Sequence, residues 1–167
     1  MQYKNLKIKF EDCIKENELL IYKVCRIYTR TEEDKQDLFQ DIVIQLWHSY
    51  SNFRGECKLS TWLYRIAIYT AITKIRKEKN LTVAIDNETL SKINTPTDES
   101  FKEKEERFLQ MYEAIDTLNN IDKAIVMLYL ENKSYEEMED ILGITQVNLR
   151  VKMNRIKEKL RQLTKNK

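Results

Sequence analysis

Residues 134–163 read SYEEMEDILGITQVNLRVKMNRIKEKLRQL. Ser134 and Glu137 have the spacing of a capping box, which starts a helix at its N-terminus. Gly143 suits the left-handed position at which that helix ends, and Thr145 is a favourable N-cap for a second helix. Two helices joined by a short turn that contains glycine form a helix-turn-helix unit. This stretch therefore predicts such a unit in the C-terminal part of the chain.

The second helix of this unit has one apolar face and one face suited to DNA. At 100° per residue, the inward side holds Leu149, Met153, Ile156, Leu160 and Leu163. The outward side and its flanks present Val147, Arg150, Val151, Lys152, Asn154 and Arg155. In a major groove Arg pairs with guanine, Asn with adenine, and Val touches a thymine methyl, while flanking cations hold phosphates. Residues 145–167 contain eight basic residues and one acidic residue, a local charge of +7. The pattern favours duplex DNA; a solvated basic helix on an RNA- or protein-binding domain is the alternative.

The rest of the chain is poor in residues that break helices. It contains two glycines, Gly55 and Gly143, and one proline, Pro96. Average usage would place about 12 glycines and about 8 prolines in 167 residues. Barrels, sandwiches and parallel α/β folds need more such turn residues, and isolated glycines do not build a phosphate loop. The composition therefore predicts an all-α protein.

The chain divides into two small helical domains, residues 1–80 and 107–167. Residues 81–106 hold seven acidic and three basic residues and Pro96, which is typical of an acidic linker. We expect this linker to tether the two halves loosely. In the first half we expect helices over about 11–28, over about 32–50 after a Thr31 cap, and from a cap at Ser60 or Thr61 to about 79.

The helix over 32–50 carries a mixed outward face. Asp37, Gln40, Asp41 and Ile44 lie within about 100° of one another on the side opposite the apolar stripe. An isoleucine among carboxylates on an outward face indicates a surface for a protein partner. A single exposed isoleucine is also ordinary in soluble proteins, and helix geometry alone leaves both interpretations open.

The helix that follows Gly55 combines cations and aromatic rings. Its basic residues are Arg65, Lys74, Arg76, Lys77 and Lys79, and its aromatic residues include Trp62, Tyr64 and Tyr69. Aromatic rings interleaved with cations suit the unstacked bases of single-stranded DNA. The alternative is that the rings belong to the core, which we favour for Trp62.

Three motifs of the first half and one of the second resemble a known family. They are Asp37-Leu38-Phe39-Gln40-Asp41 through Leu46-Trp47, Phe53-Arg54-Gly55, Thr61-Trp62-Leu63-Tyr64-Arg65-Ile66-Ala67, and residues 128–160 with Ser134-Tyr135-Glu136-Glu137 and Leu142-Gly143-Ile144-Thr145. The first three resemble region 2, and the last resembles region 4, of sigma factors of the extracytoplasmic-function (ECF) group in the sigma-70 family. The order and spacing of the motifs also match. The resemblance implies a promoter-recognition subunit of bacterial RNA polymerase.

The resemblance also implies roles for particular residues. Asp37, Gln40, Asp41 and Ile44 would dock on core RNA polymerase, which favours the partner-surface interpretation. A flipped base of the −10 element would enter a pocket in the loop of residues 53–58. The −10 set is Phe53, Arg54, Glu56, Cys57, Lys58, Thr61, Arg65, Tyr69 and Arg76. The −35 duplex would be read by Val147, Arg150, Val151, Lys152, Asn154 and Arg155. The linker would thread towards the active-site cleft of the polymerase, where negative charge suits a channel built for nucleic acid.

Four positions depart from the family pattern, and at one of them, Val43, the usual Phe is replaced by another apolar residue. The family usually has Asn at the position of Tyr69, Asp at Thr73, and a small residue at Glu139, where the two helices of the helix-turn-helix unit approach each other. Tyr69 and Thr73 lie beside the −10 pocket, so base preference there is open. We expect either that the Glu139 carboxylate points outward or that the two helices splay apart.

Other function classes find less support. Asp37, Asp41 and His48 could suggest an enzyme with a carboxylate–histidine metal site, but His48 lies away from the two carboxylates around the helix, and no second pair of ligands exists. We expect no metal, no cofactor, no small-molecule substrate, no enzymatic activity and no membrane insertion. Three cysteines without CxxC spacing fit a reducing cytoplasm. The expected partners are core RNA polymerase, promoter DNA and an anti-sigma factor. The competing function is a helix-turn-helix regulator that acts without polymerase.

Overall fold

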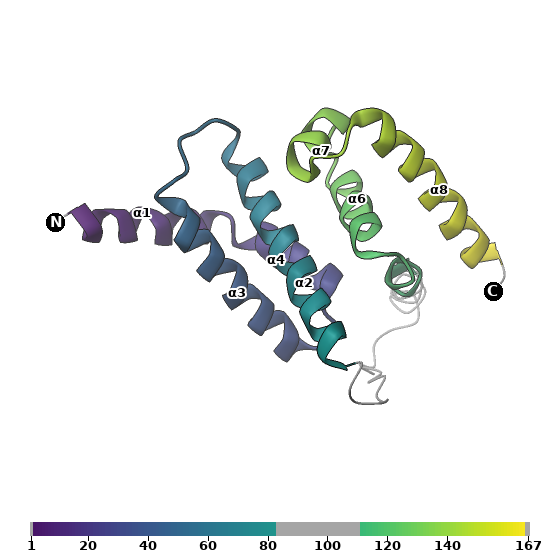
Figure 1. Ribbon diagram of the computed structural model, residues 1–167, viewed down its shortest axis with the longest axis horizontal. Helices are drawn as coiled ribbons and strands as arrows, with labels where there is room; N and C mark the ends of the chain where they lie inside the picture. The colour runs from purple at the N-terminus through teal and green to yellow at the C-terminus, as the bar shows by residue number, and fades with distance from the viewer. Residues whose placement is uncertain (1, 83–110, 166–167) are drawn as a thin grey trace, which may run out of the picture.

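The computed structural model describes residues 2–82 and 111–165 (Figure 1), and every regular element in them is a helix. The elements are α1 (Gln2–Glu16), α2 (Glu18–Tyr28), α3 (Glu32–Tyr50), α4 (Leu59–Thr82), α6 (Asn120–Leu130), α7 (Tyr135–Leu142) and α8 (Gln146–Lys165). Residues 111–116 are also helical. The prediction of an all-α fold is confirmed. The predicted acidic linker lies, from residue 83 onward, outside the described residues.

The helix expected over residues 11–28 is two helices, α1 and α2, that meet at Asn17. The side chain of Asn17 donates a hydrogen bond to the carbonyl of Cys13 at 2.8 Å, and its backbone N–H bonds to Ile14 rather than continuing the α-helical ladder. Asn competes with regular helix in this way because its short amide reaches nearby backbone groups. The expectation of one helix was wrong, because the spacing of apolar residues does not indicate a local turn within a helical stretch.

Helix α3 begins as predicted. The backbone N–H of Asp34 donates to the hydroxyl of Thr31 at 3.0 Å, which satisfies one of the free donors at the helix start. Leu38, Ile42 and Leu46 form its buried stripe and pack against α2 and α4. The opposite side of α3 thereby remains at the surface.

Helix α4 starts earlier than expected. It begins at Leu59, and the N–H of Trp62 already bonds to the carbonyl of Lys58 at 3.1 Å. Neither Ser60 nor Thr61 is therefore an N-cap. Thr61 lies inside the first turn and is only 5% exposed.

The helix-turn-helix unit forms as predicted. Both hydrogen bonds of the capping box between Ser134 and Glu137 are present, and Gly143 ends α7 in the left-handed conformation with φ of 66°. Backbone donation from Ser134, together with Lys58 nearby, lowers the pKa of Glu137. This contribution to stability is present above the ordinary glutamate pKa and is lost as the pH falls through the lowered one. Leu163 is an exception to the predicted inward face, since it is 39% exposed beyond the end of the packed surface.

The two halves of the described chain pack against each other. Helices α2 and α4 contact α6, and α4 also contacts α7 (Figure 1). Buried side chains of both halves form one continuous apolar cluster. The Tyr28 hydroxyl donates to the carbonyl of Asn120 at 2.7 Å across this boundary, and burial raises the pKa of Tyr28. The expectation of loosely tethered halves was wrong for this conformation. The halves share one apolar cluster, and a hydrogen bond joins them across the boundary.

Candidate nucleic-acid interface

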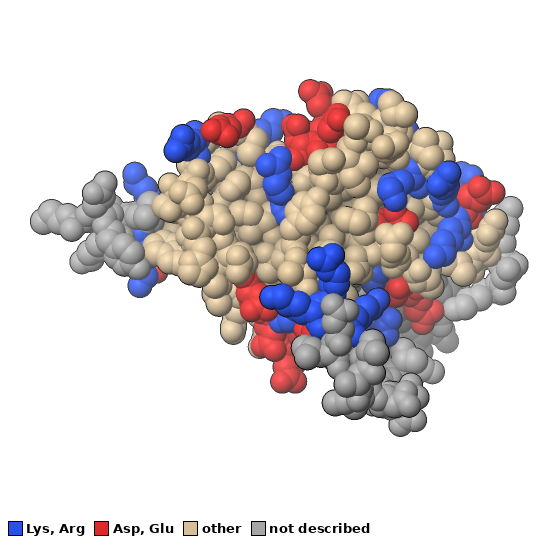
Figure 2. Space-filling model, in the orientation of Figure 1, with Lys and Arg blue, Asp and Glu red and all other residues tan. Residues whose placement is uncertain are grey.

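The outward face of α8 is open and basic. Val147 is 67% exposed, and Arg150, Val151, Asn154 and Arg155 are exposed beside it. Figure 2 shows Lys and Arg side chains gathered along α8. Leu149, Met153 and Ile156 anchor the other side of the helix in the core. The face has the size, charge and mixture of donors and methyl groups that a major groove accepts.

Arg150 and Lys152 of this face each contact a side chain of another helix. The guanidinium of Arg150 lies over the ring of Tyr135, 5.2 Å from its centroid. This stacking restrains a long side chain before any ligand binds. The amine of Lys152 instead points to Asp122 of α6 at 3.4 Å. Nothing in the sequence indicated this role for Tyr135, because Tyr135 lies in the other helix of the unit. The ion pair with Asp122 leaves Lys152 less available for a ligand than its neighbours on α8.

The loop between α3 and α4 carries a partly buried aromatic ring. Phe53 packs on Trp62 with ring centroids 5.0 Å apart, and Trp62 also approaches Tyr50. Around it Arg54, Glu56 and Lys58 are exposed, and Cys57 is half-buried. Gly55 takes a positive φ of 76°, which lets the loop turn back towards α4. The loop in which the sequence predicts the −10 site thus combines an aromatic side chain packed on α4 with exposed charged side chains.

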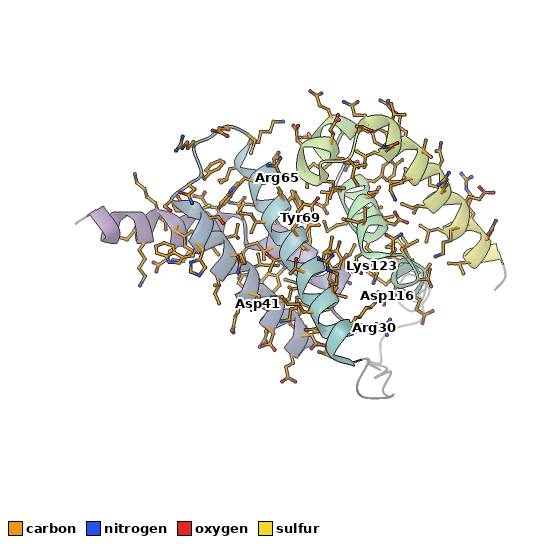
Figure 3. The ribbon with its side chains drawn as sticks, viewed as in Figure 1. Arg30, Asp41, Arg65, Tyr69, Asp116 and Lys123 are labelled. Atoms are coloured by element: carbon orange, nitrogen blue, oxygen red, sulfur yellow. The ribbon has the colours of Figure 1, made fainter. Side chains whose placement is uncertain are left out.

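The predicted −10 residues on α4 do not all face the same way. Arg65, Tyr69 and Arg76 are exposed, but buried Thr61 is not accessible to a ligand in this conformation. The Tyr69 hydroxyl donates to the carbonyl of Leu142 at 2.7 Å, and the Arg65 guanidinium donates to the carbonyl of Asp140. These two side chains contact the helix-turn-helix half, as Figure 3 shows.

The outward face of α3 is acidic with an apolar centre. Ile44 is 51% exposed, and Asp37 and Gln40 are exposed near it. Figure 2 shows acidic side chains gathered where α3 begins. This face matches the predicted mixture of carboxylates and one large apolar side chain.

A groove borders the α3 face on the side of α4. It has a volume of about 610 Å³, and Asp41, Ile44, Ile66 and Lys77 are among the residues that line it. The Lys74 amine pairs with the Asp41 carboxylate at 2.7 Å. Desolvation would lower the pKa of Lys74, but its hydrogen bond and charge pairing with Asp41 raise it above the usual value. Lys74 therefore stays charged and holds Asp41 in place, a role that helix periodicity did not reveal.

The described residues provide neither a candidate metal site nor a helix that could span a membrane. Within residues 2–82 and 111–165, no three His, Cys, Asp or Glu side chains lie close enough to hold a metal ion. In the same part of the chain, no helix is long and apolar enough to span a bilayer.

Comparison with known proteins points to one family. Residues 13–81 match the model of sigma-70 region 2, and residues 108–160 match a model of sigma-70 region 4. The RNA polymerase sigma factor SigV of Bacillus subtilis is 26% identical over 155 residues, which cover 92% of this chain and 90% of SigV. The ECF RNA polymerase sigma-E factor of Haemophilus influenzae is 31% identical over 153 residues, which cover 81% of this chain and 78% of that protein.

Two solved structures share the fold. The sigma factor RpoE of Bartonella quintana, in complex with the anti-sigma factor NepR, superposes with a TM-score of 0.74 at 16% identity, over 94% of this chain and 97% of RpoE. CnrH, in complex with the cytosolic domain of CnrY, gives a TM-score of 0.68 at 16% identity, over 96% of this chain and 90% of CnrH. With both regions matched in order along one chain, and a relative of 31% identity over most of both lengths, the protein belongs to the extracytoplasmic-function group of sigma-70 family sigma factors.

Proposed function

We propose that this chain binds bacterial core RNA polymerase and directs it to promoters, without enzymatic activity of its own. The observation that carries the proposal is the presence of both sigma regions on one chain, each with an exposed face of suitable chemistry. A helix-turn-helix regulator that acts without polymerase would need only the second region. We therefore place the protein in the cytoplasm, where core polymerase and the chromosome are found.

The −35 element is the proposed ligand of the outward face of α8. Its exposed Arg150 and Asn154 are matched to guanine and adenine edges, and Val147 and Val151 to thymine methyl groups. Arg155 is suited to a phosphate. The pairing of Lys152 with Asp122 favours a supporting role for that lysine.

The −10 element is the proposed ligand of the loop and of α4. The Phe53 ring on its Trp62 support offers a stacking surface for an unpaired base, and exposed Arg54 and Lys58 offer charge to the backbone. Glu56, Cys57, Arg65, Tyr69 and Arg76 extend this surface along the loop and α4. We do not include Thr61 in this surface, because it is buried, and we assign it a role in packing.

The outward face of α3 is the proposed docking site for core polymerase. Asp37, Gln40, Asp41 and Ile44 supply an apolar centre with a polar rim, which is how protein interfaces are commonly built. The two structural neighbours were solved with an anti-sigma factor or the cytosolic domain of CnrY, and we propose an anti-sigma partner for this chain as well.

Transcription in vitro tests the proposed function. Core polymerase is incubated with genomic DNA, with and without this chain, and the transcript ends are mapped. We expect start sites that depend on the chain and share two upstream motifs. If no start site depends on the chain, while the chain still binds DNA by itself, the regulator that acts without polymerase is the better description.

Replacing Arg150 with alanine tests the duplex readout. We expect Arg150→Ala to cost about 1–3 kcal/mol of binding and to relax preference at one −35 position, because a bidentate contact to a base is lost. Tyr135→Leu should give a smaller loss at the same position, since the ring only restrains the arginine. Competition binding with single-base variants of the −35 element measures both effects. An equal loss on all sequences would make Arg150 a phosphate contact.

Replacing Phe53 tests the −10 pocket. We expect Phe53→Ala to reduce open-complex formation more than closed-complex binding, because stacking offsets the cost of extruding a base. Phe53→Leu keeps an apolar side chain on Trp62 but lacks the aromatic face, so it should show the same defect with less effect on folding. Permanganate reactivity of unpaired thymines measures melting. Normal melting in both variants would contradict the pocket.

A further inference from the structure

Five aromatic side chains form a connected series from α1 to the loop between α3 and α4. The ring of Phe10 in α1 meets those of Trp47 and Tyr50 in α3 edge to face, with centroids 5.0 and 5.1 Å apart. The Tyr50 ring lies 6.3 Å from that of Trp62 in α4, which lies 5.0 Å from the Phe53 ring in the loop. Figure 1 shows α1 beside the end of α3 from which this loop leaves. We call these five residues the aromatic series.

The aromatic series runs from the core to the surface. Phe10 is only 7% exposed, whereas Tyr50, Trp62 and Phe53 are half-buried. Aromatic pairs prefer particular ring geometries, so the orientation of each ring constrains that of the next. The core therefore fixes the inner end of the series, while Phe53 at the outer end stays partly accessible to a ligand.

The backbone fixes where the loop starts but not where its aromatic ring points. The N–H of Phe53 donates to the carbonyl of Tyr50 at 3.2 Å as the chain turns away from α3. Residues 54–58 are not helical, and Gly55 among them takes a positive φ. The direction of the Phe53 ring consequently depends on Trp62, against which it packs, and on the rings behind Trp62.

We propose that Phe10 and Tyr50 are positioning residues for the −10 element. Through Trp62, they hold the Phe53 ring in the direction in which it stacks on an unpaired base. This inference rests on the −10 function proposed above for Phe53. Neither positioning residue needs to touch DNA. The match to sigma-70 region 2 begins at residue 13, so a side chain that precedes the matched region contributes to promoter melting.

Leucine substitutions test the proposal at two places along the aromatic series. Phe10→Leu and Tyr50→Leu each keep an apolar side chain but remove a ring. In holoenzyme with core polymerase, on a promoter mapped by the transcription experiment above, both should slow open-complex formation about two- to tenfold, the effect of one aromatic pair. Tyr50→Phe restores the ring and should restore the parent rate. Permanganate reactivity followed over time measures the rate, and titrations with core polymerase and with −35 duplex should show unchanged binding.

Loss of a ring elsewhere in the same half separates positioning from stability. Tyr22 of α2 stacks on Phe39 of α3 with ring centroids 4.8 Å apart. Phe39 lies about three helical turns before Tyr50, the residue at which α3 ends. Tyr22→Leu should therefore lower the midpoint of urea unfolding, as Phe10→Leu does, but leave open-complex formation unchanged. Far-UV circular dichroism establishes that each variant is folded at the assay temperature.

A double-mutant cycle asks whether Phe10 acts through Phe53. If the Phe10 ring matters only because it orients Phe53, then Phe10→Leu has no further effect once Phe53→Leu has removed the stacking surface. We expect the double variant to melt the promoter as slowly as Phe53→Leu alone. A purely structural role of Phe10 predicts instead that the two defects multiply.

The outcomes separate the failure of this inference from the failure of the proposed function. Normal melting by Phe10→Leu and Tyr50→Leu, beside a defective Phe53→Leu, would overturn the positioning role and leave the −10 assignment intact. An equal defect in Tyr22→Leu, or multiplied defects in the double variant, would also overturn it. Normal melting by Phe53→Leu would contradict the −10 assignment, and the positioning role with it. If Phe10→Leu does not fold, the contrast between Tyr50→Leu and Tyr50→Phe decides.

Discussion

Replacing Asp41 with arginine and Ile44 with aspartate should weaken binding to core RNA polymerase at least about 100-fold, or about 2.8 kcal/mol. Ile44 is half exposed at the centre of the proposed docking face, and a charge there would be buried without a partner on binding. Asp41→Arg reverses the sign of the rim and removes the partner of Lys74. A pull-down with core polymerase, followed by titration, measures the loss.

Two further variants separate docking from folding. Asp37→Arg with Ile44→Asp leaves the pair of Asp41 and Lys74 intact and should give a similar loss. Glu18→Arg with Leu19→Asp makes the same chemical changes at exposed positions of α2 and should bind core normally. Far-UV circular dichroism establishes that all three are folded. Unchanged core binding by both α3 variants would show that this face is not the docking site.

Replacing Leu149 with alanine should lower the free energy of unfolding by about 2–5 kcal/mol. Leu149 is fully buried between α8 and the rest of the helix-turn-helix unit, and truncation leaves a cavity that the surroundings fill only partly. Leu163→Ala is the matched control on the same helix. Because Leu163 is partly exposed, we expect a change of no more than about 1 kcal/mol.

The Leu149→Ala variant also tests whether the two halves pack together, because of where the tryptophans lie. Trp47 and Trp62, the only two in the chain, lie in the N-terminal half. If the halves share one core, Leu149→Ala shifts the urea transition seen by tryptophan fluorescence together with that seen by circular dichroism. A shift confined to circular dichroism would show that the halves unfold independently.

Local features of the structure were predictable because their causes are local. The capping box of Ser134 and Glu137, the left-handed Gly143 and the Thr31 cap each depend on residues within four positions of one another. The exposed face of α8 followed from helix periodicity and from the buried stripe on the opposite side. These are the features from which the DNA-binding face was inferred.

Features that depend on competing local bonds were harder to predict. Asn17 separates α1 from α2 through a hydrogen bond that an apolar pattern does not register. Helix α4 begins at Leu59, before the two hydroxyl residues expected to cap it, and buries Thr61. An N-cap signal in a sequence marks a residue type that suits a helix start, but packing against neighbouring helices decides which residue occupies it.

The sequence alone determined most of the helical segments, their apolar faces and the chemistry of the three outward surfaces, because each follows from spacings of three or four residues. Only the tertiary structure decided which surfaces meet. In the folded chain Lys152 pairs with Asp122, and Tyr135 lies beneath Arg150. Arg65 and Tyr69 of α4 donate hydrogen bonds to carbonyls of α7. Those contacts join residues 15 to 75 positions apart, and periodicity carries no information about which two helix faces will match.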